Sequence, residues 1–208
     1  KTVVSTHNAT KLAERYKAKL VYLSTDYVFD GTRGFYMEED DTFPLSVYGK
    51  HKLKAEDHVR EHLTNFLICR ITNVYGDEIR GKNFIARLSE NMRKKEPMEL
   101  RLPFDQYATP VNAFDVARAI YLLLSEDKKG LYHFAGTDYL NRVQLAQRVI
   151  TYFGHEQVSL IPVTTKQLAP PARRPLLGGM SAQLFNEEFP HFRWSNVDDY
   201  LQEQKDKK

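Results

Sequence analysis

The sequence predicts a protein of the α/β class whose central sheet is parallel. Short apolar runs of strand type alternate with amphipathic helical segments as far as about residue 153. Strands that alternate with helices pair in parallel through helical crossovers. The chain has 208 residues, of which 42% are hydrophobic and 27% are charged. That length and composition suffice for one sizeable core or for one and a half domains.

Composition argues against several other classes of protein. The formal net charge of +3 does not indicate a nucleic-acid partner, and the basic residues near the C-terminus have the pattern of a solvated tail. No apolar run approaches the roughly 20 residues that cross a membrane, and no signal peptide is evident. We therefore expect a cytoplasmic protein that binds neither nucleic acid nor membrane.

The single cysteine indicates a reducing environment. Cys69 lies in the apolar run 66–69, where a lone thiol is expected to be buried in a strand. No cluster of cysteine or histidine with the spacing of a zinc site is recognised, so no metal is expected.

The first half of the chain predicts three helices and two strands. The first helix is expected over residues 3–16, because most of its apolar side chains fall on one face. These side chains are Val4, Ala9, Leu12, Ala13 and Tyr16. The elements that follow are a strand at 19–24, a polar loop at 30–46, a helix from the N-cap Ser46 to about Leu63, a strand at 66–71 and a helix at 83–95.

The second half continues the alternation and then changes character. Its expected elements are a strand at 98–102, a loop at 105–110, a helix at 113–125 capped by Asn112, a strand at 131–135, and a helix at 141–153 that ends at Gly154. From Ser159 onward the chain is rich in proline and ends in a small aromatic region.

Two chain segments follow predicted strands and carry polar side chains suited to a binding site. They are Ser24–Asp26 and Arg70–Gly76. Ligands of parallel α/β sheets bind at the carboxyl ends of the strands. Tyr48 and Lys52 lie four apart on the next helix and so face the same way. A neighbouring ammonium lowers the pKa of a phenol, which makes Tyr48 a candidate proton donor.

The same residues resemble a known family. The strings Ser-Thr-Asp-Tyr-Val-Phe-Asp-Gly at 24–31 and Tyr-Gly-Lys-His-Lys at 48–52 are similar to those of the extended short-chain dehydrogenase/reductases. Within them they most resemble the dTDP-4-dehydrorhamnose reductase branch. Further segments match in order at 70–76, 105–117, 130–136 and 172–175. The resemblance implies a Rossmann-type, doubly wound parallel sheet and a small C-terminal α/β region that binds substrate.

The resemblance also implies an activity, namely the NAD(P)H-dependent reduction of a nucleotide-linked 4-keto-6-deoxy sugar. Thr25, Tyr48 and Lys52 would form the catalytic triad, in which Tyr48 donates a proton to the keto oxygen and Thr25 holds that oxygen. Ser24, Tyr48 and Lys52 would border the cofactor, NADPH or NADH. The substrate-binding residues would be Asp26, Tyr27, Asn73, Gln106 and Arg174. A homodimer is a possible assembly.

Simpler interpretations stand beside these roles. Asp26 and Asn73 are also typical of turns, Arg70 of a structural ion pair, and Arg174 of a solvated surface. Reductases of this branch tend to have an aromatic residue at the position of Asn73, so the resemblance does not determine which sugar is bound. For each of these residues outside the triad, a structural role is expected as much as a functional one.

Two other functions fit the same motifs. One is a sugar-nucleotide epimerase or dehydratase. Dehydratases usually carry acidic residues beside the triad hydroxyl, and here Asp26 follows Thr25 but no glutamate does, which mildly favours reduction. The other is a non-catalytic regulatory subunit resembling that of methionine adenosyltransferase.

The ten glycines contain no Gly-x-Gly-x-x-Gly turn for a cofactor diphosphate. We therefore expect the N-terminal, glycine-rich half of the Rossmann-type sheet to be missing from this chain. Residues 1–96 are expected to hold the triad, and 97–208 mainly the substrate-binding region. A helix and strand at about 112–135 would return to the first domain.

Overall fold

Three parallel strands form the sheet that carries the candidate site. The computed structural model describes residues 2–78, 80–94, 97–154 and 158–206. Strand β1 (Leu20–Thr25) pairs with β2 (Phe66–Ile71), and β2 pairs on its other side with β5 (Gly130–Phe134). The order β1-β2-β5, parallel throughout, confirms the predicted α/β fold.

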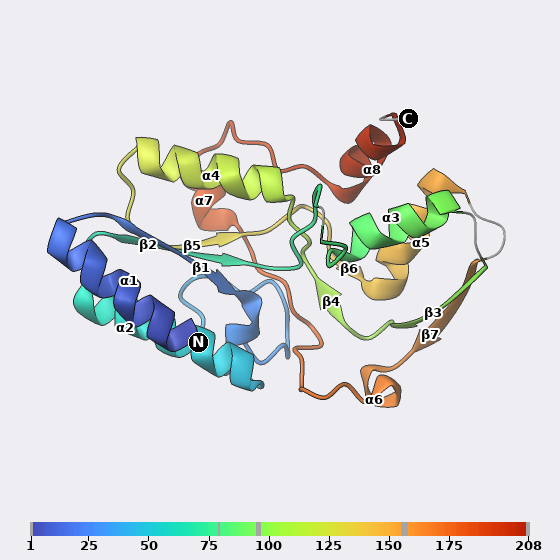
Figure 1. The fold of residues 1–208 in the computed structure, drawn as a ribbon, viewed down its shortest axis with the longest axis horizontal. Coiled ribbons are helices and arrows are strands. Elements are labelled where there is room, and N and C mark those ends of the chain that lie inside the picture. Colours follow the sequence, from blue (N-terminus) through green and yellow to red (C-terminus); the bar gives the residue numbers. More distant parts are fainter. Residues whose placement is uncertain (1, 79, 95–96, 155–157, 207–208) are drawn as a thin grey trace.

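Helices cover both faces of this sheet (Figure 1). Helices α1 (Thr2–Tyr16) and α2 (Val47–His62) lie on one face, and α4 (Ala113–Ser125) and α7 (Gln183–Glu188) lie on the other. Side chains of a strand alternate between faces. Accordingly Ile68 of β2 joins the core under α1 and α2, whereas Leu67 and Cys69 join the core under α4 and α7.

A second group of elements packs at the carboxyl end of the sheet. Helices α3 (Phe84–Lys94), α5 (Arg142–Phe153) and α8 (Val197–Asp206) share one apolar core with strands β3 (Met98–Pro103) and β7 (Val158–Val163), which pair in parallel. The short elements are the 3-10 turn η1 (Asp26–Val28), the antiparallel pair β4 (Tyr107–Ala108) and β6 (Leu140–Asn141), and helix α6 (Thr165–Leu168). No helix in the described ranges is both long and apolar enough to cross a membrane.

The predicted helix starts are confirmed at their capping residues. Ser46 Oγ accepts a hydrogen bond from the N–H of Gly49, and the Asn112 side chain accepts from the N–H of Phe114. Asn141 and Gln144 form a reciprocal capping box at the start of α5. Cys69 is fully buried in β2, as expected.

The first helix forms as predicted, but most of its apolar side chains are not buried. Val4, Leu12 and Tyr16 are 64%, 55% and 68% exposed. The buried face of α1 consists of the smaller residues Thr6, Thr10 and Ala13, of which only Ala13 belonged to the predicted apolar set. Their spacing of i, i+4 and i+7 also forms one helical face, and small side chains let α1 pack closely against α2.

The structure adds elements where the sequence predicted only loops or proline-rich chain. Strand β4 lies within the expected loop 105–110, and β7, α6, α7 and α8 lie after residue 157. Pro162 is part of β7, where it is tolerated because β7 pairs on one side only. Such elements depend on distant partners, so local sequence patterns do not reveal them.

Candidate active site

The ends of β1 and β2 and the start of α2 surround one cavity. Thr25, the last residue of β1, is in register with Ile71, the last residue of β2. The two segments singled out from the sequence therefore lie side by side. The cavity has a volume of about 390 Å³ and is lined by Leu23, Ser24, Thr25, Asp26, Tyr27, Tyr48, Lys52, Ile71, Asn73 and Val74.

The first turn of α2 sets the position of Tyr48. Ser46 caps the helix at the N–H of Gly49, at 3.1 Å. A Cβ atom on Gly49 would collide with the carbonyl oxygen of Tyr27, so only glycine allows α2 to lie this close to η1. Tyr48 is half exposed, and its ring meets the ring of Tyr27 edge to face, with centroids 5.8 Å apart.

The phenol of Tyr48 is held in its protonated form. Burial raises its pKa, a hydrogen bond with Thr25 opposes that rise, and the nearby charge of Asp26 adds to it. Lys52 does not have the expected lowering effect. Its ammonium donates to the carbonyl oxygen of Leu23 and lies 4.6 Å from the centre of the Tyr22 ring. The charge is therefore engaged at β1 rather than at the phenol.

Asp26 is a buried acid at the floor of the cavity. Thr72 Oγ1 donates to its Oδ2 at 2.7 Å, and Thr25 Oγ1 donates to its Oδ1 at 3.2 Å. Burial outweighs these hydrogen bonds and raises the pKa of Asp26 to about 6. Asp26 lies close enough to Tyr48 for its charge to raise the pKa of the phenol.

Ser24 belongs to a buried polar network behind the cavity. Its hydroxyl donates to Glu56, a fully buried residue of α2. Arg70 binds the same carboxylate through Nε and Nη2, at 3.1 and 2.8 Å, and its Nη1 lies 3.3 Å from His133 Nε2. These contacts agree with the interpretation of Arg70 as a structural ion-pair partner. Sequence reasoning missed Glu56, although it follows Lys52 by one helical turn.

A second cavity, of about 470 Å³, is basic. Gln106 and Arg174, predicted to bind substrate, both line it. Four further cations line it: Lys82, Arg87, Arg101 and Arg142. No carboxylate is among its lining residues, and none of the five cations forms an ion pair within the described ranges of the chain. Such a set of guanidinium groups suits a phosphate group.

Asn73 and Arg142 connect the two cavities. Arg142 Nη2 donates to Asn73 Oδ1 at 3.1 Å. A smaller cavity of about 210 Å³ includes both residues; it shares Asn73 with the first cavity and Arg142 with the basic one. Charged residues of both cavities act on Tyr27. Burial and the charge of Asp26 raise the pKa of its phenol, whereas Arg174 and Arg142 oppose that rise. Each of the predicted site residues thus lines one of two cavities, and the smaller cavity shares lining residues with both.

Sequence reasoning missed Arg142, although a signal was present. Arg142 is the first residue of α5, and a cation is unfavourable at the positive N-terminal end of a helix. Burial further lowers the pKa of its guanidinium. Lys82, Arg87 and Arg101 lie on separate elements, and only the tertiary structure brings them to the same cavity.

Comparison with known proteins agrees with this description. The RmlD substrate binding domain family matches residues 2–205. A dTDP-4-dehydrorhamnose reductase of Sinorhizobium fredii is 31% identical over 167 residues, which is 75% of this chain and 55% of that protein. Methionine adenosyltransferase 2 subunit beta of Xenopus laevis is 31% identical over 169 residues, 78% of this chain and 50% of that protein.

Solved structures show the same fold. The dTDP-4-dehydrorhamnose reductase of Bacillus anthracis, solved in complex with NADP, superimposes with a TM-score of 0.89 at 25% identity, and the match covers 100% of this chain and 72% of that one. Fold and motifs define a chain of the extended short-chain dehydrogenase/reductase type. It belongs to the RmlD substrate binding domain family. The chain spans about half the length of the curated relatives it matches.

Proposed function

We propose that the protein containing this chain reduces a nucleotide-linked 4-keto-6-deoxy sugar with NADPH or NADH. The observation that carries the proposal is the pair of cavities with a smaller cavity that shares lining residues with both. A protonated phenol borders one end, and five cations without ion-pair partners in the described ranges border the other. A sugar nucleotide has a matching chemistry, with a keto sugar at one end and a diphosphate further along.

The residues fit a reductive mechanism. NAD(P)H, when bound, supplies the hydride that arrives at the keto carbon. Tyr48 donates its phenolic proton to the keto oxygen, and the raised pKa of Tyr48 suits this direction because the donor is protonated before the reaction. Thr25 would turn its one hydroxyl proton from Asp26 Oδ1 to the same oxygen and hold it by a hydrogen bond.

Two residues are proposed to border the cofactor besides Tyr48. Lys52 lines the cavity, and its ammonium has three N–H donors, of which the Leu23 carbonyl takes one, so the others can bind ribose hydroxyl groups. Ser24 lines the same cavity while Glu56 holds its hydroxyl. The sugar of the substrate would contact Asp26, Tyr27 and Asn73. Its diphosphate would contact Gln106 and Arg174.

We also propose which part of the chain carries each function and how the protein assembles. Residues 1–96 would carry the triad and 97–208 mainly the substrate site, and the pairing of β5 with β2 supports the return of 112–135 to the first domain. A homodimer is supported by the exposed apolar side chains Val4, Leu12 and Tyr16 on α1. Sedimentation analysis of the wild type and a Leu12→Lys variant tests the dimer, which the substitution should weaken.

Turnover of the intact protein tests the proposed activity. NADPH absorbance should fall only when dTDP-4-dehydrorhamnose is also present, and it should not fall with a fully reduced dTDP-sugar. An absence of turnover with dTDP- and UDP-linked keto sugars, with either cofactor, would contradict the proposal.

A regulatory subunit is the second candidate. The similarity to methionine adenosyltransferase 2 subunit beta, 31% identical over 169 residues, favours it. A stable complex with a methionine adenosyltransferase catalytic subunit, together with no keto-sugar turnover, would support this alternative.

A further inference from the structure

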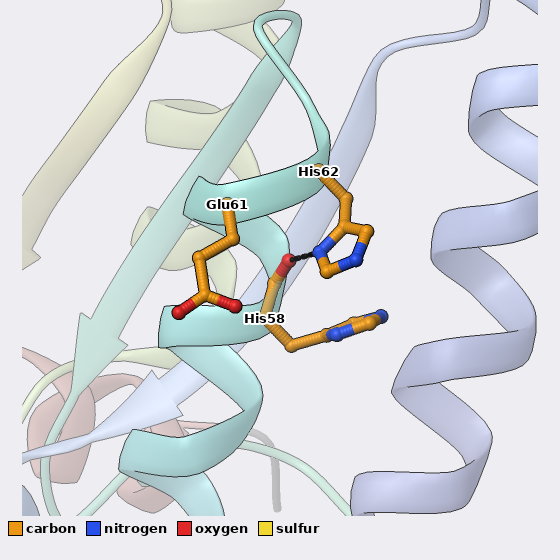
Figure 2. A group of neighbouring side chains, drawn as sticks. All are labelled: His58, Glu61 and His62. Carbon is orange, nitrogen blue, oxygen red and sulfur yellow. Dashed lines mark hydrogen bonds between the residues drawn. The ribbon is translucent and has the colours of Figure 1, made fainter.

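Two histidines and a glutamate form a cluster on α2, away from the proposed active site. His58 and His62 lie four residues apart, so their side chains leave the same side of the helix. Figure 2 shows the two rings next to each other, with the Glu61 carboxylate near the level of His58. One donor atom from each of the three side chains lies within 4.8 Å of the other two.

The hydrogen bonding of His62 leaves one ring nitrogen free. Nδ1 of His62 lies 2.9 Å from the carbonyl oxygen of His58 (Figure 2). A carbonyl oxygen only accepts, so Nδ1 carries the proton and donates. Nε2 then keeps its lone pair. A backbone carbonyl at one nitrogen and a metal at the other is the usual arrangement of a ligating histidine.

The His58 ring is held in place by its neighbouring rings. The ring of His7, on α1, stacks against it with centroids 3.7 Å apart, and the His62 ring lies 4.0 Å away on centroids. These two ring contacts keep the His58 ring beside the His62 ring.

We propose that His58, His62 and Glu61 bind a divalent cation of the late first-row transition series, with Zn²⁺ as the test ion. Two imidazoles and a carboxylate are typical zinc ligands, and water would complete the coordination. A tetrahedral site with ligand distances near 2.0 Å places donor atoms about 3.3 Å apart. His62 and Glu61 are exposed, so rotation of their side chains closes the gap from 4.8 Å.

The proposed site goes beyond the expectation of no metal. That expectation considered the cysteine and histidine spacings of zinc domains and not the pair His58-x-x-x-His62. The site does not depend on the proposed reductase activity. It lies at the C-terminal end of the helix whose first turns carry Tyr48 and Lys52, and it faces α1 through the His7 ring.

Calorimetric titration with ZnCl₂ at pH 7.5 tests the site, using the intact protein after removal of metal with a chelator. The wild type should bind Zn²⁺ saturably and unfold at a higher temperature with Zn²⁺ than without it. His62→Ala and Glu61→Gln should weaken the binding, His62→Ala by at least about tenfold, as for other losses at metal sites. His51→Ala should bind like the wild type, because His51 is exposed on the same helix outside the cluster.

NMR of the imidazole groups locates the ion and makes the result independent of whether a variant folds. In the wild type, Zn²⁺ should shift the resonances of His58 and His62 and leave those of His51 unchanged. Equal Zn²⁺ affinity in folded His62→Ala and wild type, or unshifted His58 and His62 resonances at saturating Zn²⁺, would overturn the proposal.

Discussion

Tyr48 has its protonation set by neighbours that act in opposite directions. Burial and the charge of Asp26 raise its pKa, and the hydrogen bond with Thr25 lowers it. Thr25 therefore has two proposed functions, since it tunes the phenol and holds the keto oxygen. Its hydroxyl also accepts from the N–H of Tyr27 at 3.3 Å, which ties the end of β1 to η1.

Removal of the Thr25 hydroxyl should slow turnover more than it weakens substrate binding. We expect Thr25→Val to lower kcat by roughly 100-fold, the usual effect of losing one oxygen-stabilising donor. The pH at which activity falls with ionisation of Tyr48 should rise in this variant, because a lowering influence is gone. Thr25→Ser keeps the hydroxyl and should stay near wild type. A kcat for Thr25→Val within threefold of wild type would exclude the assigned role.

Asp26 should make the folded state less stable as pH rises. Its folded pKa of about 6 lies above the ordinary 3.8, so between about pH 4 and pH 6 the folded state binds more protons than the unfolded state. The free energy of unfolding then falls with rising pH, by a contribution on the order of 3 kcal/mol. Above about pH 6 the Asp26 carboxylate is charged in both states, and the full loss of stability from burying that charge is present.

Denaturant unfolding of Asp26→Asn and wild type at pH 4 and pH 7.5 measures this contribution. The variant should gain stability relative to wild type at pH 7.5 and gain little at pH 4. The difference isolates Asp26, because the pKa of His133, lowered to about 3 by burial and by Arg70, affects both proteins alike. Equal stability differences at the two pH values would refute the raised pKa.

At the scale of elements, helix α2 joins the proposed catalytic groups to the sheet. Tyr48 and Lys52 lie in its first two turns, and Glu56 follows in the next, where it binds Ser24 of β1 and Arg70 of β2. The orientation of the helix on the sheet is thus fixed by a buried carboxylate with charged partners. The ion pair is buried on both sides, since Arg70 and Glu56 side chains are 2% and 0% exposed.

Breaking that pair should destabilise the protein strongly. We expect Arg70→Met to lower the free energy of unfolding by about 3–5 kcal/mol, because it leaves the Glu56 charge buried without its main partner. Arg60 binds the same carboxylate at 2.8 Å from a partly exposed position, so Arg60→Ala should cost no more than about 1 kcal/mol. Chemical denaturation measures the free energy of unfolding of both variants. Equal losses for the two substitutions would contradict the assigned network.

At the scale of the whole molecule, the two regions meet along the cavities. Asn73 follows β2 of the central sheet, and Arg142 begins α5 of the second region. Their 3.1 Å hydrogen bond joins the proposed sugar site to the proposed diphosphate site. Substrate binding should therefore depend on cations that lie far from the triad in sequence.

Loss of Arg142 should weaken nucleotide binding without unfolding the protein. A hydrogen bond to a charged group contributes about 1.5–3 kcal/mol, so Arg142→Gln should raise the Kd for dTDP by roughly 10- to 150-fold. Arg193→Gln removes an exposed cation that lines none of these three cavities and should leave the Kd unchanged. Calorimetric titration with dTDP gives both values, and similar affinities would count against the diphosphate site.

Local sequence patterns predicted the parts of the fold that local interactions determine. The strand 66–71 and the helices that begin after Ser46 and Asn112 were predicted because apolar periodicity and capping side chains act within a few residues. Strands β4 and β7 were missed because they depend on distant pairing. The exposed face of α1 was misread because apolar periodicity alone does not show which face a helix buries.

The same distinction applies to the candidate site. Motifs named the residues at the ends of β1 and β2 and in the first turns of α2, and the structure brings them to one cavity. The basic cavity could not be derived from spacing, since Lys82, Arg101 and Arg142 come from separate parts of the chain. The engagement of Lys52 by the Leu23 carbonyl depends on side-chain packing that the Tyr-x-x-x-Lys spacing does not specify.

Transfer of labelled hydride tests the central claim most directly. The intact protein is incubated with dTDP-4-dehydrorhamnose and NADPH deuterated at the transferable position, and the sugar product is analysed by mass spectrometry. We predict one deuterium at C4 of the product with the wild type. With Tyr48→Phe, which keeps the ring and removes the proton donor, we predict product formation slowed by at least about 100-fold at unchanged nucleotide affinity. An unlabelled product, or equal rates in the two proteins, would contradict the account.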